Sequence, residues 1–232
     1  MIHFYRRLPS IKAISFDLDD TLYNNLPILQ KAEQAQLDFI HQQVPQARAT
    51  TIKDWMVIRQ QLPINDHIGL WRQQGIYHGL LQWGLSDEEA QIISQQAFEV
   101  FYQWRNKIEL SPQVLNVLKQ LGNLYPLIAL TNGNASIEAI GLSSVFEFAI
   151  AAGDNGLSQK PATDMFDAAI KKLAIKPHEL LHIGDSLSSD VQGALNAGCS
   201  AVWFNPHGRR LSTASNLPHV EIDTLQALSL LY

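Results

Sequence analysis

Cysteine, runs of basic residues and long apolar stretches are all scarce in this chain. The 232 residues include a single cysteine, Cys199, so no disulfide can form within the chain. Such cysteine usage is typical of proteins in a reducing compartment, and we expect a cytoplasmic protein. We interpret Cys199, which stands just before an apolar stretch, as a small buried residue rather than a nucleophile.

The formal net charge is −5 at pH 7, and no run of basic residues is longer than a pair such as Arg6-Arg7. Surfaces that bind nucleic acid usually concentrate positive charge, so we expect no nucleic-acid partner. No apolar run approaches the roughly 20 residues that a membrane-spanning helix needs, so we expect no membrane partner either. An acidic protein can still bind a small anion where a few cations converge.

Strand and helix patterns alternate along most of the chain. A short apolar stretch at residues 12–17 ends in Asp17. Further strand patterns cover 126–130, 146–151, 180–184 and 200–205, and helical patterns cover 112–122, 135–141, 161–174 and 188–197. Residues 220–231 fit a short strand followed by a terminal helix. This alternation predicts an α/β fold, a Rossmann-like and mostly parallel sheet with helices on both faces.

Residues 24–108 interrupt the alternation. They are rich in Gln and Trp, their apolar residues have helical spacing, and no convincing strand pattern occurs among them. Ser86 and Glu89 form a capping-box pattern that predicts the start of a helix. We therefore predict an all-helical cap domain at 24–108, inserted into a core domain made of 1–23 and 109–232.

Polar residues follow the predicted strands at their carboxyl ends, where parallel sheets bind ligands. These residues are Asp17 and Asp19, Thr131 and Asn132, Asp185 and Asp190, and Lys160 on a loop before a helix. They converge if their strands are neighbours in the sheet. Clustered carboxylates repel one another unless a cation neutralises them, and oxygen ligands without His or Cys favour Mg²⁺.

Such a cluster suits phosphoryl transfer. A carboxylate beside a metal-bound phosphate can attack phosphorus, and a second acid can protonate the leaving oxygen and later accept a proton from water. Each residue alone also has a simpler explanation: Asp17-x-Asp19 as a capping cluster, Thr131-Asn132 as a turn, Lys160 as a solvated lysine. We interpret His182, in the strand before Asp185, as a hydrogen-bonded core histidine.

The order of these residues resembles the four motifs of the haloacid dehalogenase (HAD) superfamily. The motifs are Asp17-Leu18-Asp19-Asp20-Thr21, then Thr131, then Lys160, then Asp185 with Asp190, and they cover residues 11 to about 205. The resemblance implies that Asp17 is the nucleophile and Asp19 the acid/base. It also implies that Mg²⁺ is bound by Asp17, Asp185 and the backbone carbonyl of Asp19.

The same resemblance implies the remaining roles. Thr131, Asn132, Lys160 and the backbone N–H groups of Leu18 and Asp19 would bind the phosphoryl group. Gly133 and Asp190 would support the site, Asp190 either by holding metal-bound water or by positioning Lys160, although it could simply be a first-turn acid of its helix. An insertion after the first motif corresponds to the helical C1 cap of this family, and Tyr23 and Asn24 at its hinge are candidates for substrate contact. The cap Trp residues would form the cap core or stack on a flat ring.

A closer similarity is to a bacterial group of HAD phosphatases that act on flavin mononucleotide (FMN) and on 5-amino-6-(5-phospho-D-ribitylamino)uracil. The segments that carry it are FDLDDTLYNN, ALTNGNA, LLHIGDSLSSDV and LPHVEI. We therefore predict a Mg²⁺-dependent phosphatase that hydrolyses a small phosphorylated metabolite through an aspartyl phosphate on Asp17, as a monomer or weak homodimer.

Three alternatives remain open at this point. A phosphosugar phosphatase or mutase would share the fold. A haloacid dehalogenase would need no metal and would lack the second Asp of the first motif, whereas Asp19 is present. A non-catalytic HAD-like binding module would be expected to lose Asp17 or Lys160, and both are present.

Overall fold

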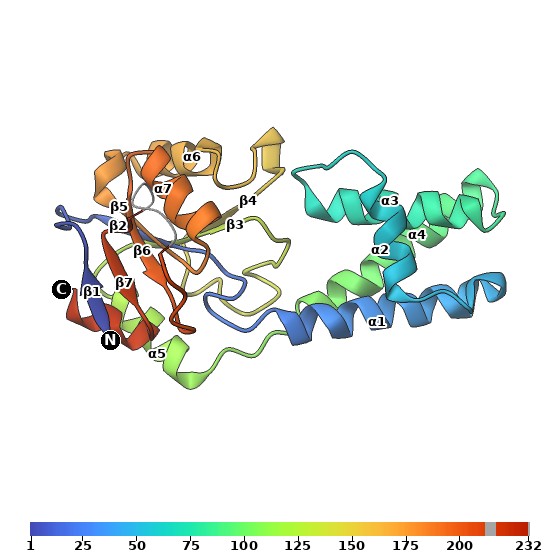
Figure 1. Cartoon of the computed structure of the whole chain (residues 1–232), viewed down its shortest axis with the longest axis horizontal. Coiled ribbons are helices and arrows are strands. Elements are labelled where there is room, and N and C mark those ends of the chain that lie inside the picture. The colour runs from blue at the N-terminus through green and yellow to red at the C-terminus, as the bar shows by residue number, and fades with distance from the viewer. Residues whose placement is uncertain (212–216, 232) are drawn as a thin grey trace. The chain divides into compact units, whose positions relative to one another are not determined.

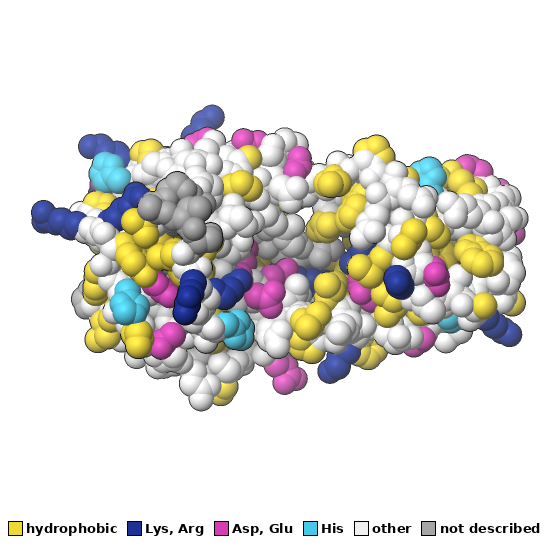
Figure 2. All heavy atoms as spheres, viewed as in Figure 1, with side chains coloured by type: hydrophobic (Ala, Val, Ile, Leu, Met, Phe, Trp, Pro, Cys, Tyr) yellow, Lys and Arg dark blue, Asp and Glu magenta, His cyan; other side chains and the backbone are white. Residues whose placement is uncertain are grey.

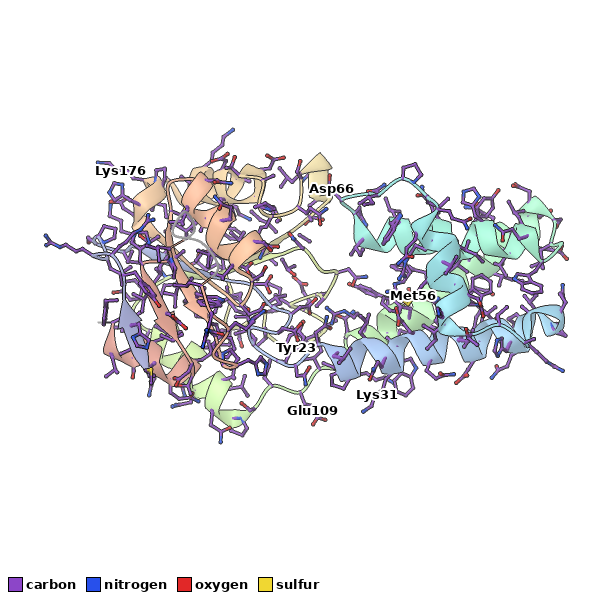
Figure 3. All side chains as sticks on the ribbon, viewed as in Figure 1. Tyr23, Lys31, Met56, Asp66, Glu109 and Lys176 are labelled. Atoms are coloured by element: carbon purple, nitrogen blue, oxygen red, sulfur yellow. The ribbon has the colours of Figure 1, made fainter. Side chains whose placement is uncertain are left out.

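The computed structural model describes residues 1–211 and 217–231, which divide into two compact units (Figure 1). Met1–Asn24 and Glu109–Tyr232 form one, called here the core unit, and Asn25–Ile108 form the other, called the helical unit. Figure 3 labels Tyr23 and Glu109, which lie next to the two points where the chain passes between the units.

Within the described residues, the core unit contains a seven-stranded sheet in the order β1-β7-β6-β5-β2-β3-β4. The strands are β1 (Ile2–Phe4), β2 (Ala13–Phe16), β3 (Leu127–Thr131), β4 (Phe148–Ala151), β5 (Leu180–Gly184), β6 (Ser200–Phe204) and β7 (Val220–Ile222). β1 pairs antiparallel with β7, and every other neighbouring pair is parallel. The predicted α/β fold with a mostly parallel sheet is confirmed.

β2 lies in the interior of the sheet, between β5 and β3, and all its residues are buried. One face of the sheet packs on α6 (Asp164–Leu173) and α7 (Gln192–Asn196) through a cluster that includes Leu130, Phe166 and Trp203. Figure 1 shows these two helices together on one side of the sheet and α5 (Pro112–Gly122) on the other. A strand covered on both faces is mostly apolar, which explains the short, largely apolar run before Asp17.

The helical unit consists of α1 (Leu26–Gln43), a 3₁₀ turn at Pro45–Ala47, α2 (Ile52–Gln60), α3 (Ile68–Gln82) and α4 (Asp87–Arg105). All its residues are described, and none lies in a strand. The predicted capping box is confirmed, since Glu89 N–H donates to Ser86 Oγ and Ser86 N–H donates to Glu89 Oε2. Apolar residues from the four helices, among them Ile40, Trp55, Leu80 and Ala97, form its own core.

Three predicted helices were wrong in form: those at 135–141 and 188–197, and the terminal helix described below. Residues 135–141 make turns that end at Gly141, whose φ of 77° leaves the helical region. The helix predicted over 188–197 begins as a π-helical turn at Leu187–Val191 and continues as α7. Its start is irregular because two side chains bond to the backbone within this turn. Ser186 N–H donates to Asp190 Oδ2, and Ser189 N–H donates to Ser186 Oγ.

The two ends of the chain also differ from the sequence pattern. The terminal helix is a 3₁₀ segment, Leu225–Leu230, with Leu225 and Leu228 buried. β1 was not predicted, because its three residues are largely exposed and it is a strand only through its pairing with β7. On the face drawn in Figure 2, Lys and Arg side chains are scattered among acidic and neutral ones. None of the described helices is both long enough and apolar enough to cross a membrane.

Candidate active site

The strands that precede the predicted site residues are neighbours in the sheet. Phe16 of β2 is in register with Ala129 of β3 on one side and with Ile183 of β5 on the other. Asp17, directly after β2, is held by a hydrogen bond from its N–H to the carbonyl of Ile183, at 2.9 Å. Asp17, Thr131 and Asp185 therefore meet at one edge of the sheet, as the sequence predicts for adjacent parallel strands.

Lys160 is buried at the centre of this group. Its Nζ lies 2.8 Å from Asp17 Oδ1 and 2.6 Å from Asp190 Oδ1, and it donates to the carbonyl of Leu130 at 2.6 Å. The side-chain amide of Asn132 clamps its backbone, accepting from Lys160 N–H at 2.8 Å and donating to Lys160 C=O at 3.0 Å. Asn132, predicted to bind phosphate, thus has both amide atoms engaged in fixing Lys160.

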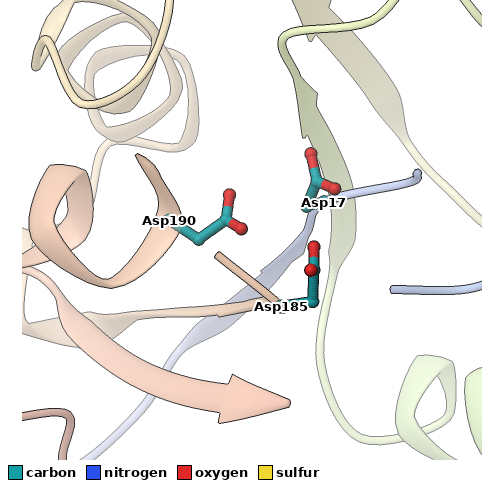
Figure 4. Close-up of side chains that lie close together, drawn as sticks. All are labelled: Asp17, Asp185 and Asp190. Atoms are coloured by element: carbon teal, nitrogen blue, oxygen red, sulfur yellow. The ribbon is translucent and has the colours of Figure 1, made fainter. Parts of the chain in front are cut away.

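Three carboxylates from separate segments point toward a common space (Figure 4). Among the described residues, Asp17, Asp185 and Asp190 each offer an oxygen, and these oxygens lie within 4.8 Å of one another. The group holds only carboxylate oxygens, the donors that hard divalent cations such as Mg²⁺ prefer. Asp190 is thus a third carboxylate in a cluster for which the resemblance implied a metal bound by Asp17, Asp185 and the carbonyl of Asp19.

The charges of this cluster are unevenly compensated. Burial and the charge of Asp190 raise the pKa of Asp17 to about 8, against the opposing effect of Lys160. Burial also acts to raise the pKa of Asp190, but the Lys160 ammonium and the hydrogen bond from His182 hold it below its usual range. Burial raises the pKa of Asp185 as well. Lys160 between Asp17 and Asp190 and Arg209 beside Asp185 therefore place two positive charges against three carboxylates.

Asp19 and the residues at its turn lie beside the carboxylate cluster. Asp20 adopts a left-handed backbone with φ 59°, and its N–H donates to the carbonyl of Tyr23, so the chain reverses directly after Asp19. Tyr23 donates its hydroxyl to Asp19 Oδ1 at 2.7 Å. The charge of Asp19 is one of the causes that raise the pKa of Asp17. Tyr23 therefore orients the predicted acid/base.

The other predicted residues surround this cluster. Thr131 ends β3 and is buried, and its Oγ1 accepts from Gly133 N–H at 3.0 Å. The side chain of Leu18 is fully buried, so only its backbone can face a ligand. Tyr23 and Asn24 line a cavity of about 620 Å³ within the core unit, together with Asp185.

Three residues without a predicted role hold Asp185 in place. Its N–H donates to Thr21 Oγ1 at 3.1 Å, and its carbonyl accepts from Trp203 Nε1 at 2.9 Å. Arg209 Nη2 donates to Asp185 Oδ2 at 3.1 Å and to its carbonyl at 2.9 Å. Thr21 could have been found from its place in the first motif, whereas no local signal points to Trp203 or Arg209.

A buried chain of hydrogen bonds lies behind Asp190. His182 Nε2 is 3.3 Å from Asp190 Oδ1, and its Nδ1 is 2.9 Å from Ser15 Oγ. Burial lowers the pKa of His182 to about 4, so the ring is neutral at pH 7. A neutral ring has one N–H, and the Asp190 carboxylate can only accept, so Nε2 donates to Asp190 and Nδ1 accepts from Ser15. The prediction of a hydrogen-bonded core histidine is confirmed.

Comparison with known proteins identifies the family. A family model described as haloacid dehalogenase-like hydrolase matches residues 11–198. The chain belongs to the haloacid dehalogenase-like hydrolases. It is 40% identical over 236 residues to the 5-amino-6-(5-phospho-D-ribitylamino)uracil phosphatase YigB of Escherichia coli (strain K12), an alignment that covers 98% of this chain and 99% of the relative.

A solved structure shares the fold, and a further curated relative is again a phosphatase. A solved structure described as 2-haloacid dehalogenase from Pseudomonas syringae pv. Tomato DC3000 has a TM-score of 0.90 and 33% identity, and covers 95% of this chain and 97% of that one. The mouse N-acylneuraminate-9-phosphatase is 33% identical over 142 residues, 57% of each chain. The predicted HAD membership is confirmed, and so is the predicted class of enzyme, a hydrolase of phosphate monoesters.

Proposed function

We propose that this HAD hydrolase is a Mg²⁺-dependent phosphatase that cleaves a small phosphate monoester through an aspartyl phosphate on Asp17. The observation that carries the proposal is the buried ammonium of Lys160, which lies 2.8 Å from Asp17 and 2.6 Å from Asp190. With Asp185 beside them, these groups are suited to bind a phosphoryl group and a cation.

The donor set fits Mg²⁺. Asp17, Asp185 and the backbone carbonyl of Asp19 would hold the ion, with Asp190 as a further carboxylate at the site. A bound Mg²⁺ would supply the missing positive charge and neutralise the phosphoryl oxygens. The pKa of Asp17, raised to about 8 by burial, supports this assignment, because an ionised nucleophile at neutral pH needs more positive charge than Lys160 provides.

The protein groups then act in two steps. Lys160 engages Oδ1 of Asp17, so Oδ2 attacks phosphorus, the new Oδ2–P bond forms, and the P–O bond to the leaving group breaks. Asp19 gives its proton to the leaving oxygen. In the second step Asp19 takes a proton from water, the water oxygen bonds to phosphorus, and the Asp17–phosphorus bond breaks to release inorganic phosphate. The Thr131 hydroxyl and the N–H groups of Leu18 and Asp19 bind the phosphoryl oxygens. The Lys160 ammonium, whose three N–H groups already contact protein oxygens, attracts them through its charge.

The proposed substrate is 5-amino-6-(5-phospho-D-ribitylamino)uracil or FMN. The support is the 40% identity to the YigB phosphatase over nearly the whole of both chains. The helical unit, inserted directly after the first motif, would act as a cap that selects the leaving group, with Tyr23 and Asn24 at its hinge. The cytoplasmic location and the monomeric or weakly dimeric state stay predictions from the sequence.

The test is a phosphate-release screen over FMN, the ribitylaminouracil phosphate, sugar phosphates and pyridoxal phosphate, with EDTA and with added Mg²⁺. We expect release that stops with EDTA, returns with Mg²⁺, and is fastest with the two riboflavin-type substrates. Release that persists in EDTA would contradict the metal. A large preference for a sugar phosphate, or isomerisation without release, would contradict the substrate. Chloride release from 2-chloropropionate would instead favour the dehalogenase activity in the description of the Pseudomonas syringae structure.

A further inference from the structure

Within the described part of the chain, a single residue orients the carboxylate of Asp185. Arg209 Nη2 donates to Asp185 Oδ2 at 3.1 Å and to the carbonyl of the same residue at 2.9 Å. One nitrogen thus bridges the side chain and the backbone of Asp185, which fixes the direction in which the carboxylate points. Thr21 and Trp203 bond only to the backbone of Asp185.

The contact with Arg209 leaves one oxygen of Asp185 available for a cation. Arg209 engages Oδ2, and Oδ1 accepts no hydrogen bond from any residue that the structure describes. The carboxylate lies beside those of Asp17 and Asp190 (Figure 4). Carboxylates that bind a metal are in turn hydrogen-bonded by a neighbouring group, and loss of that group typically weakens metal binding by roughly 10- to 100-fold. Arg209 is placed to be such a group.

The backbone of Arg209 is fixed by the side-chain amide of Asn205, which is buried and directly follows β6. Arg209 N–H donates to Asn205 Oδ1 at 2.8 Å, and Asn205 Nδ2 donates to Arg209 C=O at 2.9 Å. Gly208, with φ 61°, lets the chain turn back between the two residues. Asn205 Nδ2 also donates to Glu221 Oε1 of β7 at 2.6 Å. The base of the Arg209 side chain is therefore tied to two strands of the sheet.

The other cation of the carboxylate cluster is held in the same way. Asn132, directly after β3, bonds to both the N–H and the C=O of Lys160, as Asn205 does to those of Arg209. An arginine that formed only an exposed ion pair would contribute little and would need no buried clamp on its backbone. The repeated clamp indicates that the site uses the position of Arg209 as well as its charge.

The charge and the hydrogen bonds of Arg209 have opposite effects on a cation bound by Asp185. The guanidinium repels the cation, but the Arg209 side chain is 49% exposed and lines the cavity of about 620 Å³ together with Asp185, so water screens this repulsion. The hydrogen bonds to Asp185 act at direct contact, at 2.9 and 3.1 Å. We therefore expect the orientation of the carboxylate to outweigh the repulsion.

We propose that Arg209 is a positioning residue for Asp185 as a metal ligand, and that Asn205 positions Arg209. Together they raise the affinity of the site for Mg²⁺ and take no part in the bond changes at phosphorus. The inference rests on the proposed function, since it assigns the groups that prepare the proposed metal site.

The experiment measures Mg²⁺ binding without substrate. Metal-free protein is unfolded by heat over a series of Mg²⁺ concentrations at constant ionic strength, and the stabilisation by the ion gives its Kd. We expect Kd to rise about tenfold in Arg209→Met and about fivefold in Asn205→Ala, with Asn205→Ser in its place if that variant does not fold.

Arg210→Met is the matched control. It removes the same charge from the next residue, whose side chain is exposed and makes no contact with Asp185 among the described residues. Its Kd for Mg²⁺ should stay within about twofold of the wild type, because an exposed charge without a contact is largely screened.

Phosphate release from p-nitrophenyl phosphate gives a second readout that a merely structural role would not move. Arg209→Met should need about tenfold more Mg²⁺ for its half-maximal rate. At saturating Mg²⁺ its kcat should return to within about threefold of the wild type, because Arg209 does not touch the reacting atoms.

The outcomes separate this inference from the proposed function. If the wild type binds Mg²⁺ and Arg209→Met binds it equally well or more tightly, Arg209 does not position Asp185, and the inference alone is overturned. A kcat that stays low at saturating Mg²⁺ with an unchanged Kd would also overturn it. An unchanged Kd in the Asn205 variant would overturn the role of Asn205. If the wild type binds no Mg²⁺ and releases phosphate in EDTA, both the proposed metal and the inference are overturned.

Discussion

Gly184→Ala should damage the site without changing a single polar group. A Cβ at Gly184 would lie 2.2 Å from Cγ and 2.4 Å from Oδ2 of Asp190, whereas ordinary contacts begin at 3.4 Å. Asp190 would have to retreat by about 1 Å, out of its 2.6 Å contact with Lys160 and its 2.9 Å bond from Ser186 N–H. A displacement of that size should lower the rate of phosphate release roughly a hundredfold. The crowding and the weakened ion pair of Lys160 and Asp190 together should lower the free energy of unfolding by about 3–5 kcal/mol.

The assay is phosphate release from p-nitrophenyl phosphate, with urea unfolding on the same samples. Gly122→Ala is the matched control, because a Cβ there meets only Leu127 Cδ1, at 3.7 Å. Gly122 is the last residue of α5, so its replacement should leave activity unchanged and add about 0.5–1 kcal/mol of stability. Wild-type activity in Gly184→Ala would refute the reasoning that the position of Asp190 controls Lys160.

Two further predictions concern the buried charges. Lys160→Met removes the ammonium between Asp17 and Asp190, so the metal-free variant should lose about 3–5 kcal/mol of unfolding free energy in urea, and with added Mg²⁺ it should release no phosphate; unchanged stability would show that the pair is not buried as described. The pKa of His182 is lowered from 6.5 to about 4 by burial, so the unfolded chain binds this proton more readily than the native one. The stability due to neutral His182 is therefore complete above pH 6.5 and falls by roughly 3 kcal/mol on acidification to pH 4. Urea unfolding across this range should give a flatter profile for His182→Gln than for the wild type, and parallel profiles would refute the assignment.

The sequence alone predicted the parts of the site that depend on local pattern and topology. Strands that end in Asp17, Thr131 and Asp185 could be recognised from short apolar runs, and parallel strands must end at the same edge of a sheet. The helical insertion was recognisable because strand patterns cease between residues 24 and 108 while helical spacing continues.

Contacts between distant segments were not predictable in this way. Arg209 and Trp203 reach Asp185 across 24 and 18 residues, and β1 exists through pairing with β7 at the far end of the chain. No pattern in the local sequence predicts these contacts and this strand pairing. The π-helical turn before α7 was missed for another reason, because Asp190 bonds to Ser186 N–H and so favours a local geometry that helix propensity does not describe.

The buried charged residues of the helical unit show the same limit. Arg59, Arg72 and Glu33 are unremarkable in a charged helical sequence, and each would be taken for a solvated side chain. Only the packing of α1, α2 and α3 buries them together.

The most direct test of the account is to look for the phosphoryl group on Asp17. The enzyme is mixed with substrate and Mg²⁺, quenched in acid within the first turnover, digested and analysed by mass spectrometry, alongside Asp17→Asn. We predict that the peptide containing Asp17 carries one phosphoryl group, and that Asp17→Asn carries none and releases no phosphate. Full activity in Asp17→Asn, or a phosphoryl group on another residue, would contradict the central claim.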